Sequence, residues 1–111
     1  MADMTNMEVD AAMARGALAA QREPRASAVC YDRSAKRIMI TLTSGAELAV
    51  PIHLIEGLAG ATESQIAEVE IVGDGSGLHW EALDVDLTVP GLAMGIFGTA
   101  KWMAELAGQT K

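Results

Sequence analysis

Basic residues and cysteines are both scarce in this sequence, and each shortage excludes classes of protein. The chain has 8 Lys and Arg against 15 Asp and Glu, which gives a formal net charge of -7 at pH 7. A surface adapted to neutralise phosphates needs the opposite balance, so direct binding of nucleic acid is not expected. The one cysteine, Cys30, has no second cysteine with which to form an internal disulfide. This predicts a reduced, cytoplasmic location.

Long hydrophobic runs are also missing. No apolar run approaches the roughly 18 residues of a membrane-spanning helix. The first residues include Asp3 and Glu8, where a signal peptide would carry basic side chains. We therefore expect a protein that is neither exported nor inserted into a membrane.

The length of 111 residues suits one compact domain preceded by a helical arm. In residues 1–23, Thr5 and Glu8 have the spacing of a capping box, and an alanine-rich stretch follows them. Pro24 cannot continue this helix and marks its end. Residues 24–108 then form the predicted domain.

Within that domain, the hydrophobic pattern alternates in the way typical of β-strands. Residues 26–51 predict an antiparallel meander of three strands, and residues 68–72 predict a fourth strand followed by a glycine-rich turn. Thr62 and Thr99 each stand where the N-cap of a short helix is expected. The predicted fold is α+β, with one antiparallel sheet of four to five strands and short helices packed on one face.

The densest run of chemically distinctive residues lies between Gly77 and Leu87. His79, Asp84 and Asp86 carry donor groups that a metal or a polar small molecule could use, and the two aspartates are expected to share one strand face. Their spacing matches no standard metal-ligand pattern, so no metal and no cofactor is assigned. The alternative is that these side chains bond to loop backbone and end the strand pairing.

Two further residues of this run, Gly77 and Trp80, are also candidates for binding, but structural roles are expected for both. Gly77 is predicted to permit a turn. Trp80 is predicted to be buried and to pin the last helices to the sheet.

Cys30 falls in an alternating strand, where a small buried side chain is expected rather than a reactive thiolate. No residue is assigned a catalytic role, and an enzymatic activity has no support in the sequence.

Five apolar residues are candidates for binding a partner. They lie in the arm and near the C-terminus: Met7, Met13, Ile96, Phe97 and Trp102. Methionine and aromatic side chains adapt well to apolar partner surfaces. With the acidic composition, they favour a non-catalytic protein-interaction or regulatory module that binds another protein or itself. The competing hypothesis is a small-molecule or metal-binding module, or a weak enzyme, built around the polar candidates described above.

Several short motifs occur together in residues 24–102. The most specific are Gly-Leu-His-Trp at 77–80 and Leu-Asp-Val-Asp-Leu at 83–87. Others include Tyr31-Asp32, Val50-Pro51, Gly57-Leu58, Ala67-Glu68-Val69-Glu70-Ile71 and Val89-Pro90-Gly91-Leu92. This set resembles the bacterial domain-of-unknown-function family 2442.

The resemblance carries implications for fold and partner. It implies a small α+β module, and shorter members of the family look like partners of small toxin-like proteins. Other members carry an attached helix-turn-helix domain that binds DNA, but only nine residues follow Trp102 here, so no such domain is expected. The resemblance therefore implies a sensing or protein-binding module, with an antitoxin-like role as one expectation.

Overall fold

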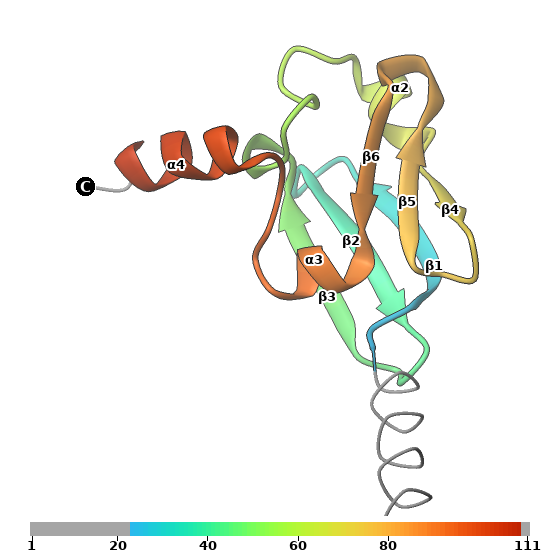
Figure 1. The fold of residues 1–111 in the computed structure, drawn as a ribbon. Coiled ribbons are helices and arrows are strands. Elements are labelled where there is room, and N and C mark those ends of the chain that lie inside the picture. The colour runs from blue at the N-terminus through green and yellow to red at the C-terminus, as the bar shows by residue number, and fades with distance from the viewer. Residues whose placement is uncertain (1–22, 110–111) are drawn as a thin grey trace, which may run out of the picture.

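The computed structural model describes residues 23–109, which fold as two three-stranded antiparallel sheets with short helices (Figure 1). Sheet A has the order β1 (Ala26–Asp32), β2 (Arg37–Leu42) and β3 (Glu47–Pro51). Sheet B has the order β4 (Glu70–Val72), β5 (Gly77–Trp80) and β6 (Val85–Thr88). The helical segments are η1 (Ile52–Leu54), α2 (Glu63–Ala67), η2 (Glu81–Leu83), α3 (Val89–Ala93) and α4 (Ala100–Gln109).

The α+β class and the first meander are confirmed, but the expected single sheet of four to five strands is wrong. The later strands form a second sheet, because β4 pairs with β5 and β5 with β6. The two sheets meet along β1 and β4, and the Ala26 N–H of β1 donates a hydrogen bond of 2.8 Å to the Gly75 carbonyl in the β4–β5 turn. Alternation in the sequence predicted which residues are extended, and long-range packing then selected their strand partners. The predicted N-terminal arm, with Met7 and Met13, lies outside the described residues.

One apolar core fills the space between the inner faces of the two sheets. Ile38 and Ile40 point into it from β2, and Leu78 and Trp80 point into it from β5. Trp80 is buried as predicted, but its indole N–H donates to the Ile66 carbonyl of α2 at 2.9 Å. Trp80 therefore fixes α2 to sheet B, rather than the last helices as expected.

The helix N-termini follow the predicted capping pattern. Thr62 Oγ1 accepts from the Gln65 N–H at 3.1 Å while Gln65 Oε1 accepts from the Thr62 N–H at 3.0 Å, which completes the capping box of α2. Thr99 Oγ1 accepts from the Trp102 N–H at 3.2 Å and caps α4. α4 continues through Gly108 to Gln109. In Figure 1, α4 projects away from the two sheets.

The outer face of β1 carries a further difference from expectation. Val29 and Tyr31 pack against the core, so Cys30, between them, points to the other side and is exposed. The expected burial of Cys30 is therefore wrong.

Across residues 23–109, every helix is too short or too polar to traverse a lipid bilayer.

Candidate functional site

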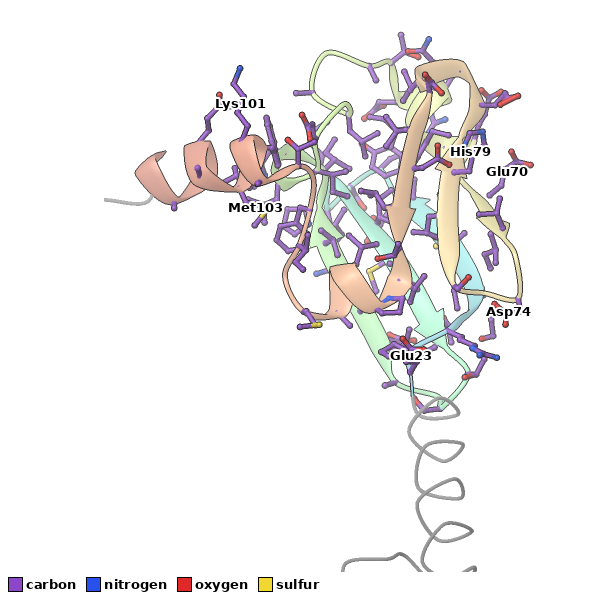
Figure 2. All side chains as sticks on the ribbon, viewed as in Figure 1. Glu23, Glu70, Asp74, His79, Lys101 and Met103 are labelled. Atoms are coloured by element: carbon purple, nitrogen blue, oxygen red, sulfur yellow. The ribbon has the colours of Figure 1, made fainter. Side chains whose placement is uncertain are left out.

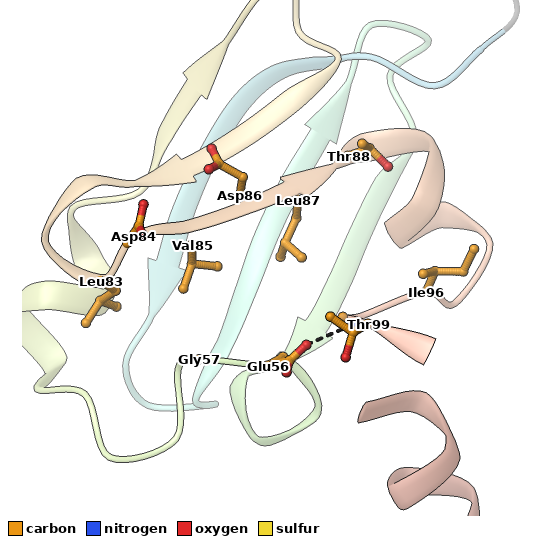
Figure 3. Close-up of a pocket in the computed structure, with 11 residues that line it drawn as sticks. Glu56, Gly57, Leu83, Asp84, Val85, Asp86, Leu87, Thr88, Ile96 and Thr99 are labelled. Carbon is orange, nitrogen blue, oxygen red and sulfur yellow. Dashed lines mark hydrogen bonds between the residues drawn. The ribbon is translucent and has the colours of Figure 1, made fainter. Parts of the chain in front are cut away.

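A groove of about 540 Å³ runs along β6, which is an edge strand of sheet B (Figure 3). Among residues 23–109, β6 pairs with β5 alone. The groove is lined by β6, by the adjoining Leu83 and Asp84, and by residues from two other parts of the chain: Glu56 with Gly57, and Ile96 with Gly98 and Thr99. It brings Asp84, Asp86 and Ile96 of the predicted candidates to one surface.

The hydrogen-bond pattern of sheet B determines which backbone groups of β6 face the groove. The register pairs Leu78 with Leu87 and His79 with Asp86, and the Val89 N–H donates to the Ser76 carbonyl at 2.8 Å in the same register. Hydrogen-bonded and non-hydrogen-bonded pairs alternate along an antiparallel ladder. Ser76 and Val89 form a hydrogen-bonded pair, and Leu78 with Leu87 is the next hydrogen-bonded pair after it. The His79–Asp86 pair follows and is therefore non-hydrogen-bonded. The backbone N–H and C=O of Asp86 turn away from β5, toward the groove, as does the N–H of Thr88.

The side chains of β6 give the groove an apolar side and a polar side. Val85 and Leu87 belong to the inner face and pack on the core, whereas Asp86 and Thr88 are exposed. Gly57 packs directly on Val85, because a Cβ placed on this glycine would lie 2.6 Å from Val85 Cγ2. Gly57 also has a φ of 91°, a backbone conformation that favours glycine.

The wall of the groove opposite β6 is fixed by Glu56. Glu56 Oε1 accepts from the Thr99 N–H at 2.8 Å, and the Glu56 N–H donates to the Phe97 carbonyl at 3.0 Å. Gly98 permits this close approach, since a Cβ there would lie 2.7 Å from Glu56 Cβ. Beside this wall, the side chain of Ile96 is 48% exposed.

His79 lies on the outer face of sheet B, between two carboxylates. Its Nδ1 is 2.6 Å from Asp86 Oδ1, and its Nε2 is 2.8 Å from Glu81 Oε2. Figure 2 shows Glu70 near His79, and the β4–β5 register pairs these two residues. The hydrogen bond that His79 donates to Glu81, followed by the one that it donates to Asp86, raises the pKa of His79 to about 9. The imidazole is therefore a cation at neutral pH, with both N–H groups donating.

This pairing limits what the predicted polar candidates can do together. A doubly paired imidazolium has no lone pair with which to accept a proton or bind a metal ion. In the described part of the chain, no group of three or more His, Cys, Asp or Glu side chains is placed to hold a metal ion. Asp84 ends η2 in the left-handed region with a φ of 53°, so it does not share a strand face with Asp86 as expected. The structure pairs His79 with Asp86 through a hydrogen bond, and Asp84, at the end of η2, takes no part in that pair.

The other predicted candidates occupy structural positions. Gly77 begins β5 and is not a turn residue, because Gly73 and Gly75 provide the positive φ angles of the preceding turn. Its missing side chain leaves room for Val72, whose Cγ2 would lie 2.9 Å from a Cβ on Gly77. Phe97 packs partly buried against the core.

Trp102 anchors α4 to the rest of the protein. Its indole N–H donates to the Leu54 carbonyl of η1 at 2.7 Å, and the side chain is only partly exposed. Ile96 is therefore the most exposed of the three C-terminal partner candidates within the described residues.

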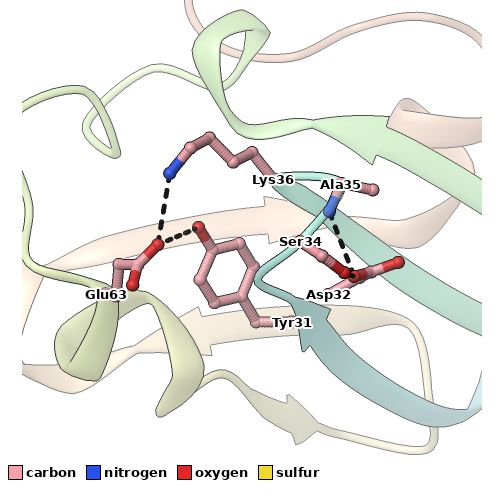
Figure 4. A network of polar contacts seen from close by, with 6 residues as sticks. All are labelled: Tyr31, Asp32, Ser34, Ala35, Lys36 and Glu63. Atoms are coloured by element: carbon pink, nitrogen blue, oxygen red, sulfur yellow. Dashed lines mark hydrogen bonds and ion pairs between the residues drawn. The ribbon is translucent and has the colours of Figure 1, made fainter.

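A second, smaller pocket of about 180 Å³ lies beside α2, next to a polar network (Figure 4). Glu63 Oε1 accepts from Lys36 Nζ at 3.2 Å and from the Tyr31 hydroxyl at 3.5 Å. In the adjoining turn, the Ala35 N–H and the Ser34 hydroxyl donate to Asp32 and lower the pKa of its carboxyl group. Since Lys36 and Tyr31 both bind Glu63, this network holds α2 against the β1–β2 turn.

Several residues of the groove were not identified from the sequence. Glu56 and Thr99 are 43 positions apart, and no local pattern links them. Thr88 is different: it caps α3 by accepting from the Gly91 N–H at 3.0 Å, and Pro90 follows in the first helical turn. A Thr-x-Pro sequence after an alternating segment is a recognisable helix start, and could have located the end of β6.

The comparisons with solved structures give two relatives. A crystal structure of a protein of unknown function from Rhodospirillum rubrum is 54% identical, with a TM-score of 0.70, covering 74% of this chain and 99% of that one. A solution NMR structure of an uncharacterized protein from Chromobacterium violaceum is 32% identical, with a TM-score of 0.69, covering 95% of each chain. No curated protein matches the sequence significantly.

A family model matches most of the region in which the sequence motifs lie. The matched region, residues 26–98, runs from the start of β1 to the groove wall beside Glu56. It includes the six strands found in residues 23–109, and His79 with both of its carboxylate partners. This chain belongs to the DUF2442 family of proteins of unknown function.

Proposed function

We propose that this protein is a non-catalytic protein-interaction module with a regulatory or antitoxin-like role. The observation that carries the proposal is the groove along the free edge of β6, with the exposed side chain of Ile96 beside it. Unpaired strand edges and exposed apolar side chains are the features that protein partners use. The antitoxin-like part rests on the family resemblance and on the acidic composition, which suits a basic partner.

The polar candidates give less support to the competing hypothesis of a metal site, a small-molecule site or a weak enzyme. His79 is a cation with both ring nitrogens bonded to carboxylates. A metal ion at His79 would have to displace a proton and one of these carboxylates. Asp84 lies in a turn and adds no ligand on the same strand face.

Copurification from the native host tests the proposed function. The full chain carrying a C-terminal tag should recover one protein partner in stoichiometric amount. Ile96→Ser should reduce that recovery several-fold, because it removes an exposed apolar contact beside the groove. Val72→Ser is the matched control, since Val72 is also an exposed β-branched side chain, at 38% against 48%, but lies on β4.

Two results would contradict the proposal. One is recovery of the chain alone when its yield is high. The other is a partner whose recovery is unchanged by Ile96→Ser and lost with Val72→Ser, which would move the interaction to the β4 side of sheet B. Circular dichroism of both variants establishes that each is folded before the comparison is made.

A further inference from the structure

We infer that the groove binds an extended segment of a partner protein as a fourth strand of sheet B, and that this segment alternates Lys or Arg with apolar residues. The inference rests on the proposed function and specifies the kind of partner. Three observations carry it: the backbone groups of β6, the charges around the groove and the apolar side chains inside it.

The backbone of β6 is suited to strand addition. Asp86 turns an N–H and a C=O toward the groove, and Thr88 turns an N–H the same way. An extended chain placed roughly 4.8 Å from β6 pairs with these groups as a neighbouring strand does. The four residues of β6 span roughly 13 Å, so three or four residues of the partner pair with it.

The charges around the edge favour basic residues in that segment. Asp86 binds His79 through Oδ1, but 71% of its side chain is exposed, on the outer face of the sheet. Asp84 is exposed at one end of the strand and also lines the groove. A Lys or Arg directly across from Asp86 forms a cross-strand pair of opposite charge, which stabilises an antiparallel neighbour.

The residues between the basic ones face the interior of the groove. Side chains alternate between the two faces of a strand, so the neighbours of the basic residue lie on the same face as Leu87. Leu87 is partly buried and Ile96 is exposed, and both line the groove. Apolar side chains from the partner cover this surface.

Two other occupants fit the same surface less well. A second copy of this chain pairing β6 with β6 would bring acidic side chains together, and like charges across a strand pair are destabilising. A helix satisfies its own backbone groups and leaves the groove-facing N–H and C=O of β6 unpaired. An extended basic segment uses the backbone, the charge and the apolar surface together.

Peptide titrations of the full ¹⁵N-labelled chain test the inference. The probes are an eight-residue peptide alternating Arg and Val, a second peptide with the same residues in two blocks, and a third alternating Glu and Val. The alternating Arg peptide should bind about tenfold more tightly than either control. The amide signals of Asp86 and Thr88 should shift most, and their hydrogen exchange should slow.

Variants and a modified peptide separate strand pairing from general charge attraction. Asp86→Asn should weaken binding of the alternating Arg peptide about fivefold, since a charged cross-strand pair is lost. Asp74→Asn, which removes the same charge from the β4–β5 turn, should leave the affinity within about twofold. Methylating alternate backbone nitrogens of the peptide should abolish binding, because the strand donors are removed.

Several outcomes would overturn the inference: equal binding of the alternating and block peptides, undiminished binding of the methylated peptide, shifts centred on α4, or a chain that is already dimeric through β6.

These results are distinguishable from failure of the proposed function. A stoichiometric partner recovered from the native host, together with no preference for the alternating peptide, leaves an interaction module that uses another surface. Peptide binding at β6 with no recovered partner supports the groove and contradicts the host interaction.

Discussion

At the residue scale, His79 shows how a polar side chain of the family motif serves the fold. It lies opposite Asp86 in a non-hydrogen-bonded pair, in which side chains of neighbouring strands approach most closely. Glu81 reaches the other ring nitrogen from η2. The imidazolium thus joins the end of β5 to β6 and to the turn between them, and neutralises part of the acidic outer face.

The paired His79 predicts a pH dependence of stability. Its pKa in the folded protein, about 9, lies above the ordinary value of 6.5, so the folded state holds the proton more tightly. The stabilisation is fully present below about pH 6.5 and is lost as the pH rises through about 9. Urea unfolding at low ionic strength should show the free energy of unfolding falling across this interval.

The variant His79→Gln provides the control for that measurement. It cannot titrate, so its free energy of unfolding should change less between pH 6.5 and 9 than that of the unmodified chain. High salt should reduce the difference between the two proteins, because both carboxylates are largely exposed. Parallel pH profiles for the two proteins would show that His79 is not the group responsible.

Among the single substitutions, one at Trp80 is expected to lower the free energy of unfolding most. Its side chain is buried between the sheets, and its indole N–H bonds to Ile66. Trp80→Ala should lower the free energy of unfolding by about 3–5 kcal/mol, through lost apolar contacts and the cavity that remains. Equilibrium unfolding measures the change. A loss below about 1 kcal/mol would contradict the core role and return Trp80 to the candidates for binding.

At the element scale, the segment between β3 and α2 forms part of the groove and depends on close packing. Glu56 holds the start of α4, and the adjoining Gly57 packs on Val85 of β6. Gly57 and Gly60 both have positive φ angles, of 91° and 85°. Only Gly57 has a neighbour within reach of an added Cβ, so the two positions separate backbone strain from packing.

The two glycines predict different costs for the same substitution. Gly57→Ala should destabilise the protein by about 1–3 kcal/mol more than Gly60→Ala, because its methyl group collides with Val85 while both variants carry the backbone penalty. Urea unfolding of both variants gives the difference. Equal losses would mean that the Glu56–Gly57 segment moves away from β6 at little cost.

At the scale of the whole molecule, the two sheets form one structural unit because neither has a complete core of its own. Ile38 and Ile40 from sheet A meet Leu78 and Trp80 from sheet B in the same cluster. A sheet must bury its hydrophobic face against another element to form a stable domain. The free edge of β6 remains on the outside of this unit, where the groove is formed.

The shared core predicts cooperative unfolding of the two sheets. Ile38→Ala and Leu78→Ala remove fully buried side chains from opposite sheets, and each should cost about 2–5 kcal/mol. In both variants, hydrogen exchange in β2 and β5 should rise together. Selective loss of protection in one sheet, with the other unchanged, would contradict a common core.

Local patterns in the sequence were sufficient to predict several of the elements and some of their ends. The alternation at Ile38 and Ile40 located β2, the Thr62–Gln65 spacing gave the capping box of α2, and Thr99 began α4. These features depend on side-chain periodicity and on hydrogen bonds between neighbours in the chain. They require no knowledge of which strands meet.

The assembly of the candidate site required the tertiary structure. The sequence by itself determined the charge, the strand periodicity, the helix caps and the family motifs. Only the fold decided that the later strands form a second sheet, that Asp86 pairs with His79 while Asp84 lies in the preceding turn, and that Glu56 lies opposite β6. The physical reason is that pairing and packing join residues far apart in the chain, and several partners satisfy the same alternating pattern. The complete core selects one arrangement among them, and that choice left the edge of β6 open.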